Sequence, residues 1–136
     1  MPLIVWNETM SVGVKDLDEQ HKKLVDILNE LHESIAAEQS KEVLGKIIEK
    51  LIEYTRVHLG YEERILFQAE YPELSEHGRQ HDEMIATALA AQAKVRWGAS
   101  PGLSLEILEF LQNWLINHIQ GSDKLYTAHL HAHGIS

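Results

Sequence analysis

Four long stretches of this chain each carry a stripe of mostly apolar residues at intervals of three or four positions, which is the spacing of one helix face. In the first stretch the stripe is Leu17, His21, Leu24, Leu28, Leu31 and Ile35. The other three stretches also place at least one histidine in the stripe, and no stretch alternates long enough to favour a strand. The pattern therefore predicts an all-α protein in which each helix buries one face.

Short breaks in the pattern set the order of these helices. We expect an N-terminal arm over residues 1–15 and helices over about 17–38, 41–70, 74–97 and 103–131, which together form one domain across residues 1–136. Because the joints between the long helices are short, helices that are neighbours in sequence should run antiparallel. The predicted fold is an up-down-up-down antiparallel four-helix bundle with an N-terminal arm.

The helix boundaries follow from residues that cap or break helices. Asp16 or Asp18 could cap the first helix and Ser40 the second, since short polar side chains accept hydrogen bonds from the free N–H groups there. Pro72 should end the second helix, because the residue before a proline avoids helical dihedral angles. The Gly-Ala-Ser-Pro-Gly segment at 98–102 is typical of a loop and should precede the last helix.

Composition narrows the chemistry that the chain can perform. The 136 residues are enough for one ordinary domain, and they include no cysteine, which excludes disulfides, thiolate metal sites and a cysteine nucleophile. A net charge of −9 disfavours nucleic acid as a partner. No apolar run approaches the roughly 18 residues of a membrane span, and the N-terminus does not resemble a signal peptide. We therefore expect a cytoplasmic protein, and nothing in the sequence demands more than a monomer.

Six polar residues fall on the buried stripes and indicate a metal site. They are His21, His58, Glu62, His77, His81 and His118. A lone histidine on such a stripe is usually a core residue, but burying an unpaired carboxylate costs several kcal/mol, and a group of dry imidazoles gains nothing. A bound metal ion would coordinate the imidazoles and neutralise the carboxylate. The pairs at i and i+4 lie about 40° apart around the helix axis, so each pair presents two side chains to one point.

Asp123 is a candidate seventh ligand that a regular helix would not supply. It follows His118 by five positions, which places it about 140° around the helix axis. It could share the site if the helix contained a π-bulge or a break, after which the stripe would resume with Tyr126 and Leu130. The alternative is an unbroken helix with Leu125 inward and Asp123 in solvent, and the spacing alone favours this alternative.

Three further histidines, His129, His131 and His133, alternate near the C-terminus. They could bind a metal ion. Residues at a chain end are more often exposed or frayed, and this is the arrangement that we expect here.

Taken together, these motifs resemble the hemerythrin family. The matching segments are Asp18-Glu-Gln-His21, His58-x-x-x-Glu62, His77-x-x-x-His81 and His118-x-x-x-x-Asp123, with Trp6 in the arm. The resemblance covers nearly the whole chain, and all seven ligand positions of the family are filled.

The resemblance implies a non-haem di-iron centre, bridged by an oxo or hydroxo group, that binds O₂ reversibly for storage, transport or delivery and is not an enzyme. One iron would be held by three histidines and the other by two, with both carboxylates bridging; the sets are His77, His81 and His118, then His21 and His58, then Glu62 and Asp123. The second iron would keep an open position for O₂, where small anions or NO could also bind. The alternatives are O₂, NO or redox sensing, and iron storage or peroxide chemistry at the same site.

The open position should face a dry pocket. A carrier has to bind O₂ without activating it, and nearby water or a general acid would leave inactive ferric iron. Helix register and the resemblance place six residues around this position, none of them acidic: Leu24, Leu28, Leu59, Trp114, Leu115 and Ile119.

Overall fold

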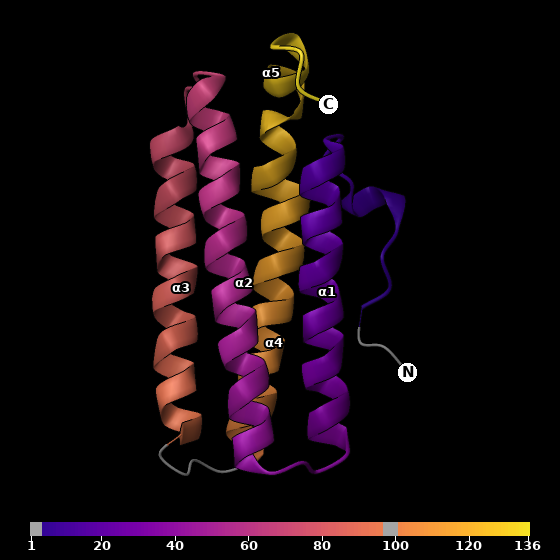
Figure 1. The fold of residues 1–136 in the computed structure, drawn as a ribbon, viewed down its shortest axis with the longest axis vertical. Coiled ribbons are helices and arrows are strands. Elements are labelled where there is room, and N and C mark those ends of the chain that lie inside the picture. Colours follow the sequence, from indigo (N-terminus) through magenta and orange to yellow (C-terminus); the bar gives the residue numbers. More distant parts are fainter. Residues whose placement is uncertain (1–3, 97–100) are drawn as a thin grey trace.

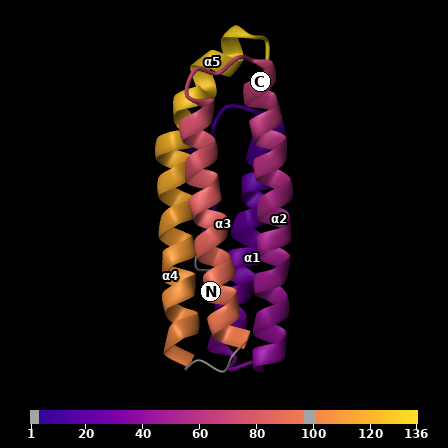
Figure 2. The ribbon, with the colours of Figure 1, turned by 90° about the vertical axis from the view of Figure 1, so that its left-hand side faces the viewer.

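The fold is a bundle of four long helices. In the computed structural model, which describes residues 4–96 and 101–136, these helices are α1 (Lys15–Ala36), α2 (Lys41–Gln68), α3 (Leu74–Arg96) and α4 (Pro101–Asn117). They lie side by side, and helices that follow one another in sequence run in opposite directions (Figure 1 and Figure 2). α1 and α3 each pack against both α2 and α4. No strand occurs among the described residues, so the predicted all-α, up-down-up-down bundle is confirmed.

Shorter helical elements precede and follow the bundle. The arm contains a 3-10 turn (Glu8–Met10), and α4 continues into a π-helical turn (His118–Ser122), a 3-10 turn (Asp123–Tyr126) and α5 (Thr127–Ala132). The expected single helix over 103–131 is therefore a series of pieces. It also begins earlier than expected, because Pro101 suits the first position of a helix. Of the expected loop, residues 98–100 lie outside the described residues and the last two are helical.

The start of α1 differs from the prediction. The helix begins at Lys15, and Val14 holds the cap position without any side-chain hydrogen bond, so neither Asp16 nor Asp18 is the cap. The carboxylate of Asp18 instead accepts a hydrogen bond from the N–H of Val12, at 2.8 Å, and ties the arm to the first turn of the helix.

α2 begins as predicted but ends early. The hydroxyl oxygen of Ser40 accepts a hydrogen bond from the N–H of Val43. At the other end Glu70 takes a left-handed conformation, with φ of 54°, and the N–H of Tyr71 donates to the carbonyl of Leu66. This closure, a Schellman motif, ends the helix two residues before the predicted boundary, and α1 ends in the same way. The following proline is not what ends α2.

The core lies between the helices, where the predicted stripes meet. The four leucines of the predicted stripe on α1 are at most 3% exposed: Leu17, Leu24, Leu28 and Leu31. Burial of each such side chain stabilises the fold by about 1.5–3 kcal/mol. The arm adds Val12 and Val14, and the chain after α4 adds Tyr126 and Leu130.

The expected exposed or frayed tail is corrected in part, because the C-terminal end is anchored rather than frayed, although two of its three histidines are exposed. A ring N–H of His129 donates to the carbonyl of Ala69 at the end of α2, and one of His131 donates to the carbonyl of Gly13 in the arm, at 2.7 Å. Gly13 has a positive φ of 73°, and a Cβ there would lie 3.0 Å from the side chain of Thr127. These contacts join α5 to two distant parts of the chain. Of the three histidines, His131 and His133 are exposed and His129 is half-buried.

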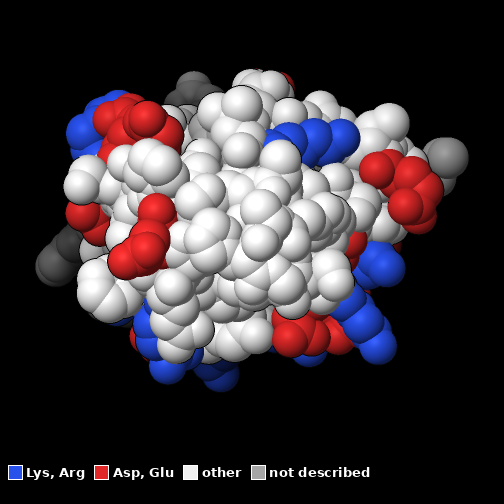
Figure 3. All heavy atoms as spheres, turned by 90° about the horizontal axis from the view of Figure 1, so that it is seen from above, with Lys and Arg blue, Asp and Glu red and all other residues white. Residues whose placement is uncertain are grey.

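The surface at this end of the molecule is mixed in charge. Viewed from above in Figure 3, it has an uncharged centre with acidic and basic side chains dispersed around it. None of the helices in residues 4–96 and 101–136 is long and apolar enough to cross a membrane.

Candidate metal centre

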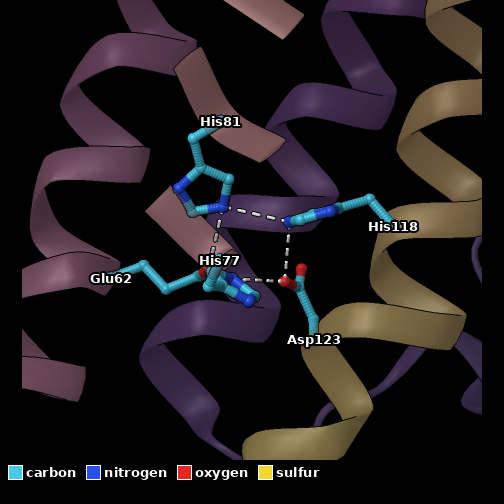
Figure 4. A group of neighbouring side chains, drawn as sticks. All are labelled: Glu62, His77, His81, His118 and Asp123. Atoms are coloured by element: carbon cyan, nitrogen blue, oxygen red, sulfur yellow. Dashed lines mark hydrogen bonds and ion pairs between the residues drawn. The ribbon is translucent and has the colours of Figure 1, made fainter. Parts of the chain in front are cut away.

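The structure brings all seven candidate ligands together near the α5 end of the bundle, and they come from α1, α2, α3 and the two turns that follow α4. Each is at most 7% exposed. Their ligand atoms form two overlapping groups, each within 4.8 Å. One group is Glu62, His77, His81, His118 and Asp123, which Figure 4 shows converging on one point; the other is His21, His58 and Glu62.

The carboxylate of Glu62 lies between the two groups. Its Oε1 is 2.5 Å from Nε2 of His77 and 3.3 Å from Nε2 of His81. Its Oε2 is 3.4 Å from Nε2 of His58 and 3.6 Å from Nε2 of His21. One oxygen therefore faces each group, which is the arrangement that a bridging carboxylate needs.

The two carboxylate oxygens of Asp123 also face different histidine groups. Oδ1 is 3.0 Å from Nε2 of both His77 and His118, whereas Oδ2 is 3.2 Å from Nε2 of His21. Glu62 and Asp123 thus each face histidines of both groups.

A π-helical turn brings Asp123 into the site. It spans His118–Ser122 and adds the extra residue that the five-position spacing requires. Asp123 is 0% exposed and Leu125 is 72% exposed. The unbroken helix, which the spacing alone favoured, is therefore wrong.

Charge balance in the cluster depends on the histidines. Burial raises the pKa of Glu62 and of Asp123, but contacts with the surrounding histidines outweigh it and hold both pKa values below their usual range. Burial lowers the pKa of His21 and His77, but contacts with the two carboxylates outweigh it and raise each pKa to about 9. Protons on these histidines balance the carboxylates, and metal ions could take their place.

Several buried nitrogen and oxygen atoms of the site make no hydrogen bond. They are Nδ1 and Nε2 of His21, Nδ1 of His81 and both oxygens of Asp123. The oxygens of Asp123 lie close to histidine nitrogens without the alignment of a hydrogen bond. Nε2 of His81 lies 3.0 Å from Nε2 of His118, so two ring nitrogens point at each other. Lone pairs that converge in this way suit a cation, and a mixed imidazole and carboxylate set suits iron, among other metals.

Three neighbouring side chains hold the site in place, and sequence reasoning assigned none of them this role. The N–H at Nδ1 of His58 donates to Oε1 of Gln20 at 2.6 Å, which leaves Nε2 to face Glu62. The hydroxyl of Tyr126 donates to Oε2 of Glu62 at 3.1 Å. The ring of Trp114 stacks on His118 with centroids 4.3 Å apart. Gln20 directly precedes His21, but the sequence alone does not show that it contacts His58 on α2.

A small cavity of about 20 Å³ adjoins the site. That is room for about one water-sized molecule. Its walls are apolar except for the site residues and Thr55, whose hydroxyl donates to the carbonyl of Leu51. It is lined by His21, Leu24, Leu28, Leu51, Thr55, His58, Leu59, Met84, Leu111, Trp114, Leu115, His118 and Asp123.

Five of the six residues expected around the open position line this cavity, and Ile119 does not. Ile119 is fully buried, but it follows His118 in the π-helical turn, where regular helix register no longer applies. Sequence reasoning also missed Leu51, Thr55, Met84 and Leu111. Leu51 and Leu111 each precede a site histidine by seven positions, so the same stripe could have identified them.

Comparisons with known proteins agree with this arrangement. Residues 12–130 match a family model described as the hemerythrin HHE cation binding domain. The chain is 32% identical to a bacteriohemerythrin of Stenotrophomonas maltophilia, over 98% of this chain and 85% of that protein. It is 31% identical to a myohemerythrin of Theromyzon tessulatum, over 92% of each chain. A crystal structure of wild-type hemerythrin superposes with a TM-score of 0.86 at 29% identity, covering 94% of this chain and 98% of that one.

Proposed function

Because this chain belongs to the hemerythrin family, we propose that it binds O₂ reversibly at a non-haem di-iron centre, for oxygen storage, transport or delivery. A cytoplasmic monomer without enzymatic turnover is part of the same proposal. Light scattering of the iron-loaded protein tests the monomer.

The proposed ligands are the seven clustered residues. Three histidines (His77, His81 and His118) would hold one ion and two (His21 and His58) the other, with Glu62 and Asp123 between them. The division of the carboxylate oxygens between the two groups supports this assignment. When bound, ferrous iron supplies the electrons that O₂ takes up on binding and gives back on release.

The single observation that carries the proposal is where the cavity lies. It reaches both His21 and His58, the group with fewer histidines, whereas of the other group's three histidines only His118 lines it. A small apolar molecule would therefore meet the side of the centre that has fewer protein ligands. NO and small anions would meet the same side.

The residues around the cavity keep water and protons away from that side. The non-ligand lining residues carry no acid, and the one hydroxyl, on Thr55, already donates to its own helix. Tyr126, whose hydroxyl donates to Glu62, does not line the cavity. This separation supports reversible binding over oxidation.

The test is to load the protein anaerobically with ferrous iron, measure iron per chain, and then add and remove O₂ repeatedly. We expect two ions per chain and a visible absorption band that appears with O₂ and disappears on its removal over several cycles. One irreversible oxidation would overturn the carrier proposal and favour iron storage or peroxide chemistry. Full reversibility with NO but not with O₂ would favour sensing.

A further inference from the structure

The ring of His81 has a nitrogen for which the site provides no partner. Its Nε2 faces the cluster, 3.3 Å from Oε1 of Glu62 and 3.0 Å from Nε2 of His118. When Nε2 donates its lone pair to a metal ion, the proton must reside on Nδ1. Nδ1 is buried and makes no hydrogen bond. A histidine that binds a metal ion almost always donates this second N–H to an acceptor, as His58 does to Gln20.

Glu63 supplies a carboxylate close to this nitrogen. Its Oε1 lies 3.8 Å from Nδ1 of His81, slightly beyond hydrogen-bond distance. The side chain is 38% exposed and lines an open groove between α2 and α3. It therefore has room to move toward the ring. Glu63 directly follows Glu62 in α2, so two consecutive carboxylates face the two ring nitrogens of His81.

Gly78 provides the space that this carboxylate occupies. A Cβ at Gly78 would lie 2.8 Å from Oε1 of Glu63, closer than real Cβ atoms approach another atom. Glycine within a helix lowers its stability, so its presence on α3, between His77 and His81, calls for a reason. Gly60, which lines the same groove from α2, has nothing within 4 Å of its Cβ position. An alanine at Gly60 would therefore disturb nothing nearby.

We propose that Glu63 is a positioning residue for the metal centre, and that its carboxylate accepts a hydrogen bond from the Nδ1–H of His81 when the site is loaded. The glycine at position 78 leaves the room for this contact. The contact fixes the tautomer and ring orientation of His81, and its negative charge makes the imidazole a stronger donor. This inference rests on the proposed metal-binding function.

The test uses Zn²⁺, which is diamagnetic and leaves O₂ chemistry out of the measurement. In ¹H–¹⁵N spectra of the Zn²⁺-loaded protein, we expect the Nδ1–H proton of His81 to be shifted downfield and slow to exchange with water. Glu63→Ala should lose both properties and lower Zn²⁺ affinity by about 10–100-fold in chelator competition. Glu63→Gln keeps an acceptor oxygen and should retain the proton signal with a smaller downfield shift.

The two glycines give a matched pair of variants. Gly78→Ala should displace the carboxylate of the untouched Glu63 and so change the Nδ1–H signal of His81, whereas Gly60→Ala should match the wild type. If Gly78→Ala does not fold, the Glu63 variants still decide the question. The inference is overturned if the Nδ1–H signal of Glu63→Ala equals that of the wild type. Failure of the O₂ cycles with this signal intact would overturn only the carrier proposal, and a wild type that binds no metal would overturn both.

Discussion

Two adjacent layers of the bundle use the same four helices in opposite ways. The site layer, made of the seven candidate ligands, is polar and depends on an irregular turn after α4. The cavity layer lies next to it, away from α5, and consists of Leu24, Leu28, Leu51, Thr55, Leu59, Met84, Leu111, Trp114 and Leu115. It is almost wholly apolar and keeps regular helix register. The comparison separates two tasks, because one layer balances charge and the other, in our proposal, excludes water.

The largest expected effect is loss of the metal from the site layer. Glu62→Gln removes the negative charge that faces both histidine groups, and we expect iron affinity to fall by more than about 100-fold, beyond what an outer contact costs. Iron per chain after dialysis measures it. Glu53→Gln is the control, because that carboxylate lies on the same helix with 70% of its side chain exposed. Equal iron retention in both variants would remove Glu62 from the site.

The irregular turn can be tested by deleting single residues. Deleting Gly121 takes out the extra residue of the π-helical turn, so His118 and Asp123 become four positions apart and Tyr126 keeps its buried face. Deleting Asn113 from the regular part of α4 rotates everything after it by about 100°. We expect the first variant to fold and the second to lose its cooperative thermal transition. If both variants melt alike, the register argument fails.

A polar residue in the cavity layer should damage reversibility without removing the metal. Leu59→Asn brings a hydrogen-bonding group into the cavity wall, and we expect the O₂-bound form to decay at least about tenfold faster, a barrier change of about 1.4 kcal/mol. Decay of the visible band measures this rate. Val57→Asn is the matched control, because Val57 is 67% exposed on the same helix. Equal decay rates would show that dryness of this layer does not matter.

The pH dependence of stability should separate the metal-free from the loaded protein. His21 and His77 have folded-state pKa values raised to about 9 from 6.5, so their stabilisation is fully present below pH 6.5 and is lost as pH rises toward 9. The lowered pKa values of Glu62 and Asp123 act in the other direction, and their stabilisation is lost in acid, below the ordinary carboxyl range.

We therefore expect the melting temperature of the metal-free protein to fall by about 5 °C or more between pH 6 and pH 9. The loaded protein should show a smaller change, because metal ions rather than protons balance the carboxylates. If the melting temperature changes with pH equally in the metal-free and the loaded protein, this account is wrong.

Sequence reasoning located the residues whose burial depends on the face of a single helix. It failed where contacts between residues distant in the sequence decide the local structure. The stripes located the bundle and six residues of the site layer, because burial follows helix period. From spacing alone the turn at Asp123 could be stated only as an alternative, and the family resemblance was needed to place Asp123 among the ligands, since the turn depends on what the buried histidines gain from a second carboxylate. Ile119 lies in that same turn and does not line the cavity. The early ends of α1 and α2 were missed because glutamate gives no signal for a left-handed conformation.

The shared carboxylates have a consequence for how the protein acquires its metal. Since Glu62 and Asp123 each place one oxygen toward each histidine group, a first ion would fix both side chains in the orientation that a second ion needs. A half-loaded centre would leave free oxygens aimed at an empty neighbour. Loading should therefore be cooperative, and at limiting iron the population should consist mainly of chains with both ions and chains with none.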